Sequence, residues 1–100
     1  MRKLTLALIA VVTLLVTDTS AGEKLKLLIV DGQNNHNWKL TTPVLKSFLE
    51  KSGRFTVTVA TSPGRNGKDA DWARFRPNFA AAHVVLSNYN GQLWPKPVQN

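Results

Sequence analysis

An uninterrupted run of four apolar residues, Leu27 to Val30, constrains the fold of this chain more than any other feature of its sequence. The run ends at Asp31-Gly32, a pair typical of a tight turn. A strand with one wet face alternates apolar and polar residues, whereas an unbroken apolar run indicates a strand buried on both faces. The sequence therefore predicts a buried strand over Lys24 to Val30, in a parallel sheet with helices on both sides.

Residues from about 42 to 52 are expected to form the helix that follows this strand. Thr41-Thr42-Pro43 offers a hydroxyl cap and a proline at the first helical position, where the missing N–H is not needed. One apolar stripe is then formed by Val44, Leu45, Phe48 and Leu49. Gly53 suits the left-handed residue that often ends a helix. The N-terminus of this helix would face the preceding polar loop and favour an anionic or strongly polar ligand group there.

Two further strands are expected. Phe55 to Thr61 alternates apolar and hydroxyl side chains, which predicts a strand at or near a sheet edge. Val84 to Leu86 is continuously apolar and predicts a third strand. His83, which begins that strand, is expected at the end of the sheet opposite the polar loops, and we assign it no functional role.

The segments between and after these strands contain most of the aromatic residues. Residues 62–71 are rich in Pro, Gly, Asn and Asp, which predicts a loop. Three aromatic residues follow, interrupted by Pro77, and we expect a short broken helix whose rings pack under the sheet: Trp72, Phe75 and Phe79. Trp94-Pro95 is interpreted as the start of another helix.

Clusters of polar and aromatic side chains follow the first and third strands, and they are the predicted functional site. The predicted substrate-binding residues are Gln33, Asn34, Asn35, Trp38, Ser87, Asn88, Tyr89 and Asn90, and the predicted catalytic residue is His36. In an open parallel sheet, ligands bind beyond the carboxyl ends of the strands, where both clusters would lie. The alternative is structural: the amides cap nearby backbone groups and Trp38 fills a gap in the core.

The chemistry of these side chains suits a sugar. An indole and a phenol, Trp38 and Tyr89, can stack on the apolar face of a pyranose ring, while amides bind its hydroxyl groups. His36 would act in acid/base or orienting work, and a base needs a partner to orient it. Asp31 is either that partner or a turn residue. Only Asp31 and His36 are close in sequence, so no metal site is predicted, and the sequence identifies no cofactor.

The first residues predict export. Arg2 and Lys3 precede an apolar segment, Leu4 to Val16, and small residues follow up to Gly22, as in a secretory signal peptide. We place cleavage after Ala21, so residues 1–21 are the predicted signal peptide and the product is periplasmic or secreted, without stable membrane insertion. The alternative is an uncleaved N-terminal anchor.

Cysteine and charge exclude several classes. The chain has no cysteine, which excludes a disulfide framework, a thiolate zinc site and a cysteine nucleophile in this stretch. Loss of residues 1–21 would change the net charge from +7 to +6, because Arg2, Lys3 and Asp18 lie there. The remaining basic residues are scattered rather than clustered, which argues against nucleic acid as a partner. The expected partner is a small-molecule carbohydrate.

Several segments together resemble the start of a ThuA-like domain, from the trehalose-utilisation family. They are Leu27 to Trp38, Thr41 to Leu45, Ser52 to Val57, Phe75 to Phe79 and Val84 to Gly91. The likeness covers about residues 24–96, so residues 22–100 are assigned to the N-terminal part of such a domain. The resemblance implies a flavodoxin-like three-layer α/β/α sandwich, similar to class I glutamine amidotransferases. Here the parallel sheet is expected to have about three strands in the order 2-1-3.

The resemblance also implies a function in sugar metabolism. In the amidotransferase relatives a cysteine nucleophile lies on a later strand-to-helix turn, where ThuA-like domains tend to carry histidine, and this chain ends before such a turn. Asn37 stands where many relatives have an acidic residue, which argues against a base or metal ligand there. The complete domain is expected to be an enzyme acting on, or a protein binding, a carbohydrate-related molecule. The alternatives are a non-catalytic sugar-binding module of an envelope protein and a truncated product without activity.

The expected sheet is incomplete, which suggests a marginally stable fragment. Ordering residues 22–100 costs on the order of 120 kcal/mol at about 1.5 kcal/mol per residue, and half a domain buries little apolar surface to offset that cost. The third strand would also be left as an apolar open edge, which favours aggregation. The fragment alone is therefore not expected to be an active enzyme.

Overall fold

The computed structural model describes residues 22–100 and contains a parallel sheet of three strands. The strands are β1 (Leu25–Asp31), β2 (Phe55–Thr61) and β3 (Val84–Ser87), in the order β2-β1-β3. Ile29 of β1 pairs in register with Val59 of β2 and Leu86 of β3. The predicted α/β fold with strand order 2-1-3 is confirmed. The predicted signal peptide, residues 1–21, lies outside the described residues.

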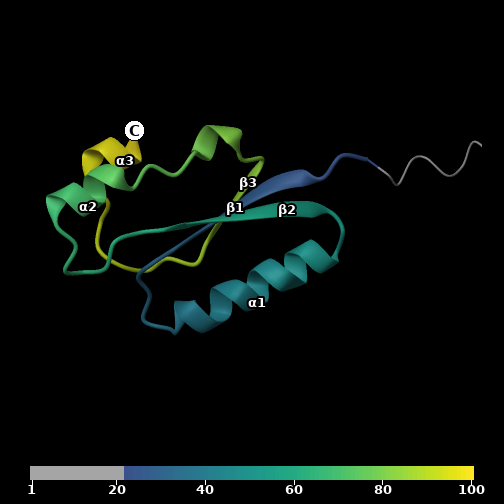
Figure 1. Cartoon of the computed structure of the whole chain (residues 1–100), viewed down its shortest axis with the longest axis horizontal. Coiled ribbons are helices and arrows are strands. Elements are labelled where there is room, and N and C mark those ends of the chain that lie inside the picture. The colour runs from purple at the N-terminus through teal and green to yellow at the C-terminus, as the bar shows by residue number, and fades with distance from the viewer. Residues whose placement is uncertain (1–21) are drawn as a thin grey trace, which may run out of the picture.

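Helices cover both faces of this sheet (Figure 1). On one face lies α1 (Trp38–Lys51), and on the other lie α2 (Asp69–Arg74), the 3-10 turn η2 (Phe79–Ala81) and α3 (Lys96–Gln99). Within residues 22–100, none of these helices combines the length and hydrophobicity needed to cross a bilayer. The arrangement is a three-layer α/β/α sandwich around β1.

Strand β1 forms part of two hydrophobic cores because its side chains alternate between the two faces of the sheet. Leu27 and Ile29 pack with Val57 beneath α1, and Ile29 is fully buried. Leu28 and Val30 face the opposite side and pack into the core there. This double burial confirms the interpretation of the unbroken apolar run.

The second core is aromatic, as predicted for a broken helix. Trp72 of α2 and Phe75, which follows α2, are both buried against β1, and their rings meet edge to face at 5.8 Å. Val98 of α3 is buried in the same cluster, and Phe79 packs against it. Residues 72–79 therefore pack under the sheet, with α2 ending before Pro77.

The predicted start of α1 is wrong by about one turn. The helix begins at Trp38, with Asn37 as its N-cap residue, so Pro43 lies inside the helix. The carbonyl of Asn37 accepts hydrogen bonds from the backbone N–H groups of Leu40 and Thr41, which builds the first turn before the proline. Pro43 lacks the N–H that would bond the carbonyl of Lys39, and its ring crowds that carbonyl, but this disturbs only one bond near the start of the helix. The sequence rule therefore misplaced the boundary.

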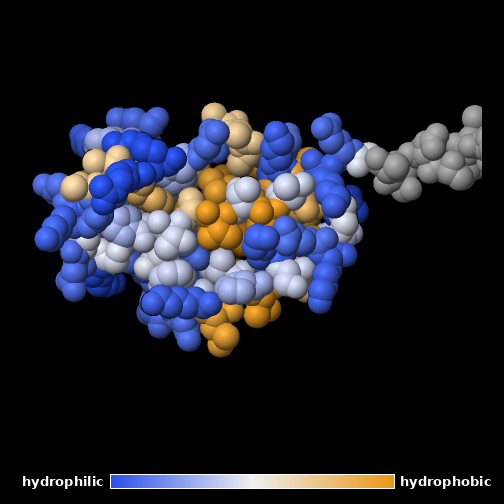
Figure 2. Space-filling view, in the orientation of Figure 1, coloured by the Kyte–Doolittle hydropathy of each residue, from blue (hydrophilic) through white to orange (hydrophobic). Residues whose placement is uncertain are grey.

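The apolar stripe predicted on α1 is also only half correct. Leu45 and Leu49 pack against the core under α1, whereas Val44 and Phe48 are 63% and 74% exposed. With Leu40, these two side chains form an uncovered apolar stripe along the helix. Hydrophobic atoms are visible over the sheet and on the α1 side of the molecule (Figure 2). The helix buries a narrower face than its sequence predicts.

The burial of Ile29 gives a stability prediction. Ile29→Ala removes a fully buried side chain between two paired strands, so we expect the free energy of unfolding to fall by about 2–5 kcal/mol. Urea denaturation followed by circular dichroism measures this loss. Val44→Ala is the matched control, because an exposed side chain should change stability by no more than about 0.5 kcal/mol. Equal effects of the two substitutions would contradict the assignment of the core.

Candidate functional site

Three loops meet at the carboxyl end of the sheet: residues 32–37 after β1, 62–68 after β2, and 88–92 after β3. The N–H of Ser62 donates to the carbonyl of Asp31 at 2.9 Å, and the N–H of Asn88 donates to that of Val30 at 2.8 Å. These bonds continue the ladders on both sides of β1. The two predicted clusters of site residues are thus brought to one edge, as expected for parallel strands.

Gln33 links all three loops. Its amide nitrogen donates to the carbonyl of Pro63 at 2.9 Å and to Oε1 of Gln92 at 3.3 Å, and its Oε1 accepts the N–H of Gln92 at 2.9 Å. The side chain is buried. A Cβ at Gly91 would lie 2.4 Å from Gln33, so only glycine permits this approach. The polar atoms of Gln33 are therefore used within the protein.

Asn34 and Asn88 join the first loop to the third loop and to α1. The amide nitrogen of Asn34 lies 3.3 Å from the carbonyl oxygen of Asn88 and 3.4 Å from its Oδ1. The amide nitrogen of Asn88 in turn donates to the hydroxyl groups of Thr41 at 3.0 Å and Thr42 at 2.9 Å. Asn34 also accepts the backbone N–H of His36 at 3.1 Å. One connected network thus sets the conformation of the His36 loop.

Asn35, Asn90 and Ser87 are exposed, whereas Asn34 and Asn88 are half-buried. Asn90 and Asn35 contact each other across the loops at 3.4 Å. Ser87 makes only 3.4 Å contacts, both to the backbone of Tyr89. The side chains of these three residues remain accessible at the edge of the sheet.

The imidazole of His36 is exposed and makes no hydrogen bond to any residue of the described part. Asp31, the candidate orienting partner, is buried and accepts the Thr61 hydroxyl at 2.6 Å. No bond joins Asp31 to His36 within residues 22–100. The structure therefore presents a solvated histidine on a loop held by its backbone.

Trp38 is half-buried at the start of α1. The ammonium group of Lys39 lies 5.7 Å from the centre of its ring, within range of a cation–π contact. This placement leaves part of the indole accessible beside the His36 loop.

Tyr89 belongs to an aromatic cluster around Trp94. Its ring meets that of Trp94 edge to face at 5.5 Å, and its hydroxyl donates to the carbonyl of Gln92. Burial raises the pKa of the Tyr89 phenol, and the Trp94 indole and the positive charge of Arg65 oppose that effect. The phenol therefore stays protonated at neutral pH and acts as a donor.

A cavity of about 570 Å³ opens beside this cluster. Some of its lining residues belong to a segment that was predicted to begin a helix. The lining residues include Tyr89, Asn90, Gln92, Trp94 and Gln99. Gln92 and Trp94 come directly after the predicted cluster. Polar and aromatic side chains continue past Gly91, and a predicted site extended along this run would have included both residues.

The remaining titratable groups give no metal centre. His83 lies at the opposite end of the sheet, as predicted, where its Nδ1 accepts the backbone N–H of Lys26 at 2.9 Å. Among residues 22–100, no group of three or more His, Asp or Glu side chains is placed to hold a metal ion.

The fold of this chain is similar to that of a solved structure. The chain is similar to a protein described as thua-like, from Parabacteroides merdae ATCC 43184, with 38% identity and a TM-score of 0.70. That match covers 77% of this chain and 26% of the other protein, so this chain spans about a quarter of its length. No family model and no curated protein matches the chain. The structural neighbour supports the resemblance to ThuA-like domains.

The network around Asn88 gives a prediction that can be tested without a ligand. Asn88→Ala removes the two bonds to Thr41 and Thr42 and leaves Asn34 without a side-chain acceptor, so we expect a loss of about 1–3 kcal/mol in unfolding free energy. Hydrogen exchange at the His36 amide should accelerate, because only the contact with the backbone carbonyl of residue 88 would still hold Asn34.

Ser87→Ala is the matched control, since Ser87 makes only long contacts in the same loop. It should leave both stability and exchange nearly unchanged. If Asn88→Ala leaves the exchange rate of His36 unaltered, the network does not position that loop.

Proposed function

We propose that this chain is the N-terminal part of an exported ThuA-like domain that binds or acts on a carbohydrate-related small molecule. Two kinds of observation support the proposal. One is the 38% identity to a thua-like protein over most of this chain. The other, which carries the argument, is the network that fixes the His36 loop against the loop after β3.

The polar and aromatic side chains at this edge have two different roles in the proposed binding of a sugar. The amides of Gln33, Asn34 and Asn88 serve mainly to hold the loops, so their role in binding would be indirect. Direct contacts would come from accessible groups on the same edge, such as Asn35 and the indole of Trp38. A preorganised rim of this kind lowers the entropic cost of binding.

His36 would be the catalytic residue if the complete domain is an enzyme. Its imidazole is free to contact a ligand, while its backbone is fixed through Asn34. An imidazole can both accept and donate a proton, which suits acid/base work. A further reacting group would come from a part of the protein beyond this sequence.

A non-catalytic sugar-binding module is the second candidate. It is favoured by one observation, which is that the buried carboxylate of Asp31 bonds to Thr61 and not to His36. A histidine without an orienting partner is a poor general base. Binding without turnover would follow from that arrangement.

The test of His36 uses the complete domain, of which this chain is proposed to be the N-terminal part, and a panel of disaccharides. Ligand binding is followed by titration calorimetry, and conversion is followed by chromatography of the sugar products. For an enzyme, His36→Ala should lower turnover by about 100-fold or more, as expected for loss of a general acid or base, with little change in affinity. A binding module should show no conversion and almost unchanged affinity.

Asn78→Ala is the control, because Asn78 is exposed beside η2 on the far side of the sheet from α1. A chain that binds none of the sugars would contradict both candidates and favour a truncated product without activity.

Export has its own test. The full sequence is produced in a bacterial host, and mass spectrometry should find a periplasmic or secreted product beginning at Gly22. Val12→Asp places a charge in the apolar segment and should keep the protein unprocessed, whereas Thr13→Ser should not. A product that retains residues 1–21 in the membrane would support an uncleaved anchor instead.

A further inference from the structure

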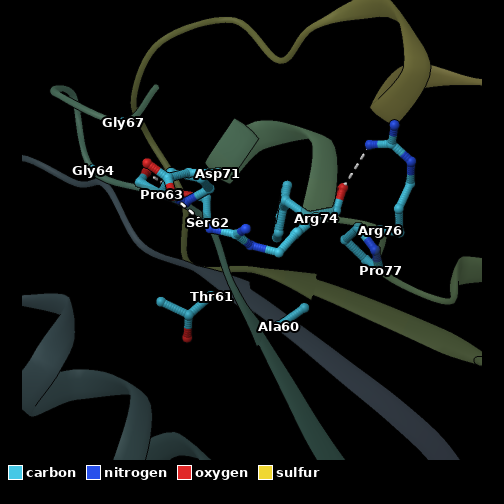
Figure 3. Close-up of a pocket in the computed structure, with 11 residues that line it drawn as sticks. Ala60, Thr61, Ser62, Pro63, Gly64, Gly67, Asp71, Arg74, Arg76 and Pro77 are labelled. Atoms are coloured by element: carbon cyan, nitrogen blue, oxygen red, sulfur yellow. Dashed lines mark hydrogen bonds and ion pairs between the residues drawn. The ribbon is translucent and has the colours of Figure 1, made fainter. Parts of the chain in front are cut away.

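A second pocket opens where β2 ends, outside the predicted sugar site. Its volume is about 500 Å³, and it lies between the loop after β2 and the residues of α2 and its C-terminal end (Figure 3). The lining residues are Ala60, Thr61, Ser62, Pro63, Gly64, Gly67, Asp71, Arg74, Phe75, Arg76 and Pro77. None of them belongs to the site predicted from the sequence, which treated this loop as a connection.

The pocket has a local excess of positive charge. Two basic residues, Arg74 and Arg76, line it together with a single acidic residue, Asp71. The bordering loop adds Arg65 and Lys68, and Asp69 begins α2. A concave surface with this charge raises the local concentration of anions.

Arg74 is the side chain best placed to bind such an anion. It extends across the pocket toward Ser62 and Asp71 (Figure 3). One nitrogen, Nη2, lies 2.9 Å from Oδ1 of Asp71, but the Arg74 side chain is 74% exposed. An ion pair that exposed contributes little stability, so an incoming anion can compete for the guanidinium. The planar group can then donate two parallel hydrogen bonds to a carboxylate or phosphate.

Arg76 and Asp71 are held in place by other bonds. Arg76 Nη1 donates to the carbonyl groups of Phe75 at 3.0 Å and Trp72 at 3.3 Å, and in Figure 3 it turns away from Arg74. Its charge therefore contributes to the potential without direct contact. Asp71 Oδ2 accepts the backbone N–H of Lys68 at 3.0 Å, which keeps this carboxylate beside Arg74. The Asp71 carboxylate therefore competes with an incoming anion for the Arg74 guanidinium.

The opposite wall of the pocket is open backbone at Gly64. Nothing lies within 4 Å of the position that a Cβ would take at Gly64, so the main chain there is open to a ligand. Ser62 is buried and its hydroxyl donates to the carbonyl of Pro63. A compact anion can therefore approach this wall without steric conflict.

We propose that this pocket binds the carboxylate or phosphate group of a small molecule, with Arg74 as its direct ligand. The pocket adjoins the predicted sugar site, because Gln33 donates to the carbonyl of Pro63 in its wall. Resting on the proposed function, the carbohydrate-related ligand would then be an acidic or phosphorylated sugar rather than a neutral one.

The experiment uses the protein with its full chain and four probes at constant ionic strength: inorganic phosphate, glucose 6-phosphate, glucuronate and glucose. Binding is followed by NMR shifts of the Gly64 and Gly67 amides. The anions should cause saturable shifts, and glucose should cause none at these two residues. Saturation by phosphate alone as strongly as by glucose 6-phosphate would identify a free anion as the ligand and would overturn the sugar assignment.

Two variants should have opposite effects. Arg74→Gln should weaken anion binding by about tenfold, as expected for a lost charge-assisted pair. Asp71→Asn keeps an acceptor for the Lys68 N–H but removes the competing charge, so it should strengthen binding several-fold. A structural defect would weaken binding in both variants. Lys46→Gln, which removes an equal charge from α1, is the control and should change affinity by less than twofold.

The outcomes separate this proposal from the sugar proposal. Absence of saturable shifts with all three anions, or equal losses in Arg74→Gln and Lys46→Gln, would overturn the anion site. Anion binding without any sugar contact at the His36 loop would keep the pocket and overturn the sugar function. Binding of glucose 6-phosphate or glucuronate that shifts Asn35 and Trp38 but never Gly64 would do the reverse.

Discussion

The structure depends on the burial of β1 on both faces. Leu27 and Ile29 close the core under α1, while Leu28 and Val30 close the aromatic core on the other side. The hydrophobic cluster on either face of the sheet would be small by itself. Because both clusters contain side chains of β1, this strand is packed on both faces. It is also paired with a neighbouring strand along each edge. A rigid central strand then sets where each loop begins.

The polar edge follows from that rigidity. Gly32 has a φ of 122°, and a Cβ there would lie 2.2 Å from the Ser62 hydroxyl oxygen, so the chain turns at the end of β1 in contact with the loop after β2. The amides beyond it then meet the loop after β3. Most of their bonding capacity joins loop to loop, and they leave His36 and Asn35 accessible. The same edge therefore combines a fixed scaffold with a few free polar groups.

Apolar surface remains uncovered on the described part of the chain. Val84 and Val85 of β3 are 38% and 46% exposed, and α1 carries its own exposed stripe at Val44 and Phe48. Exposed edge strands with apolar side chains promote association between chains. The pocket beside α2 differs in kind, because it contains the exposed side chain of Arg74, paired with Asp71. Its polar groups suit a small molecule better than they suit a second apolar surface.

The amino-acid sequence by itself determined the strands and the broken aromatic helix, because apolar patterns and turn residues are local signals of burial and chain reversal. The strand order was implied by the resemblance to ThuA-like domains. The sequence also indicated the two polar loops that follow β1 and β3. The tertiary structure decided where α1 begins and that Val44 and Phe48 face solvent, since both depend on how the helix lies on the sheet. It also decided that Gln33, Asn34 and Asn88 bond to other loops, and that Arg74 lies across a pocket. Hydrogen bonds between residues 30 to 60 positions apart depend on side-chain geometry, which no local pattern in the sequence specifies.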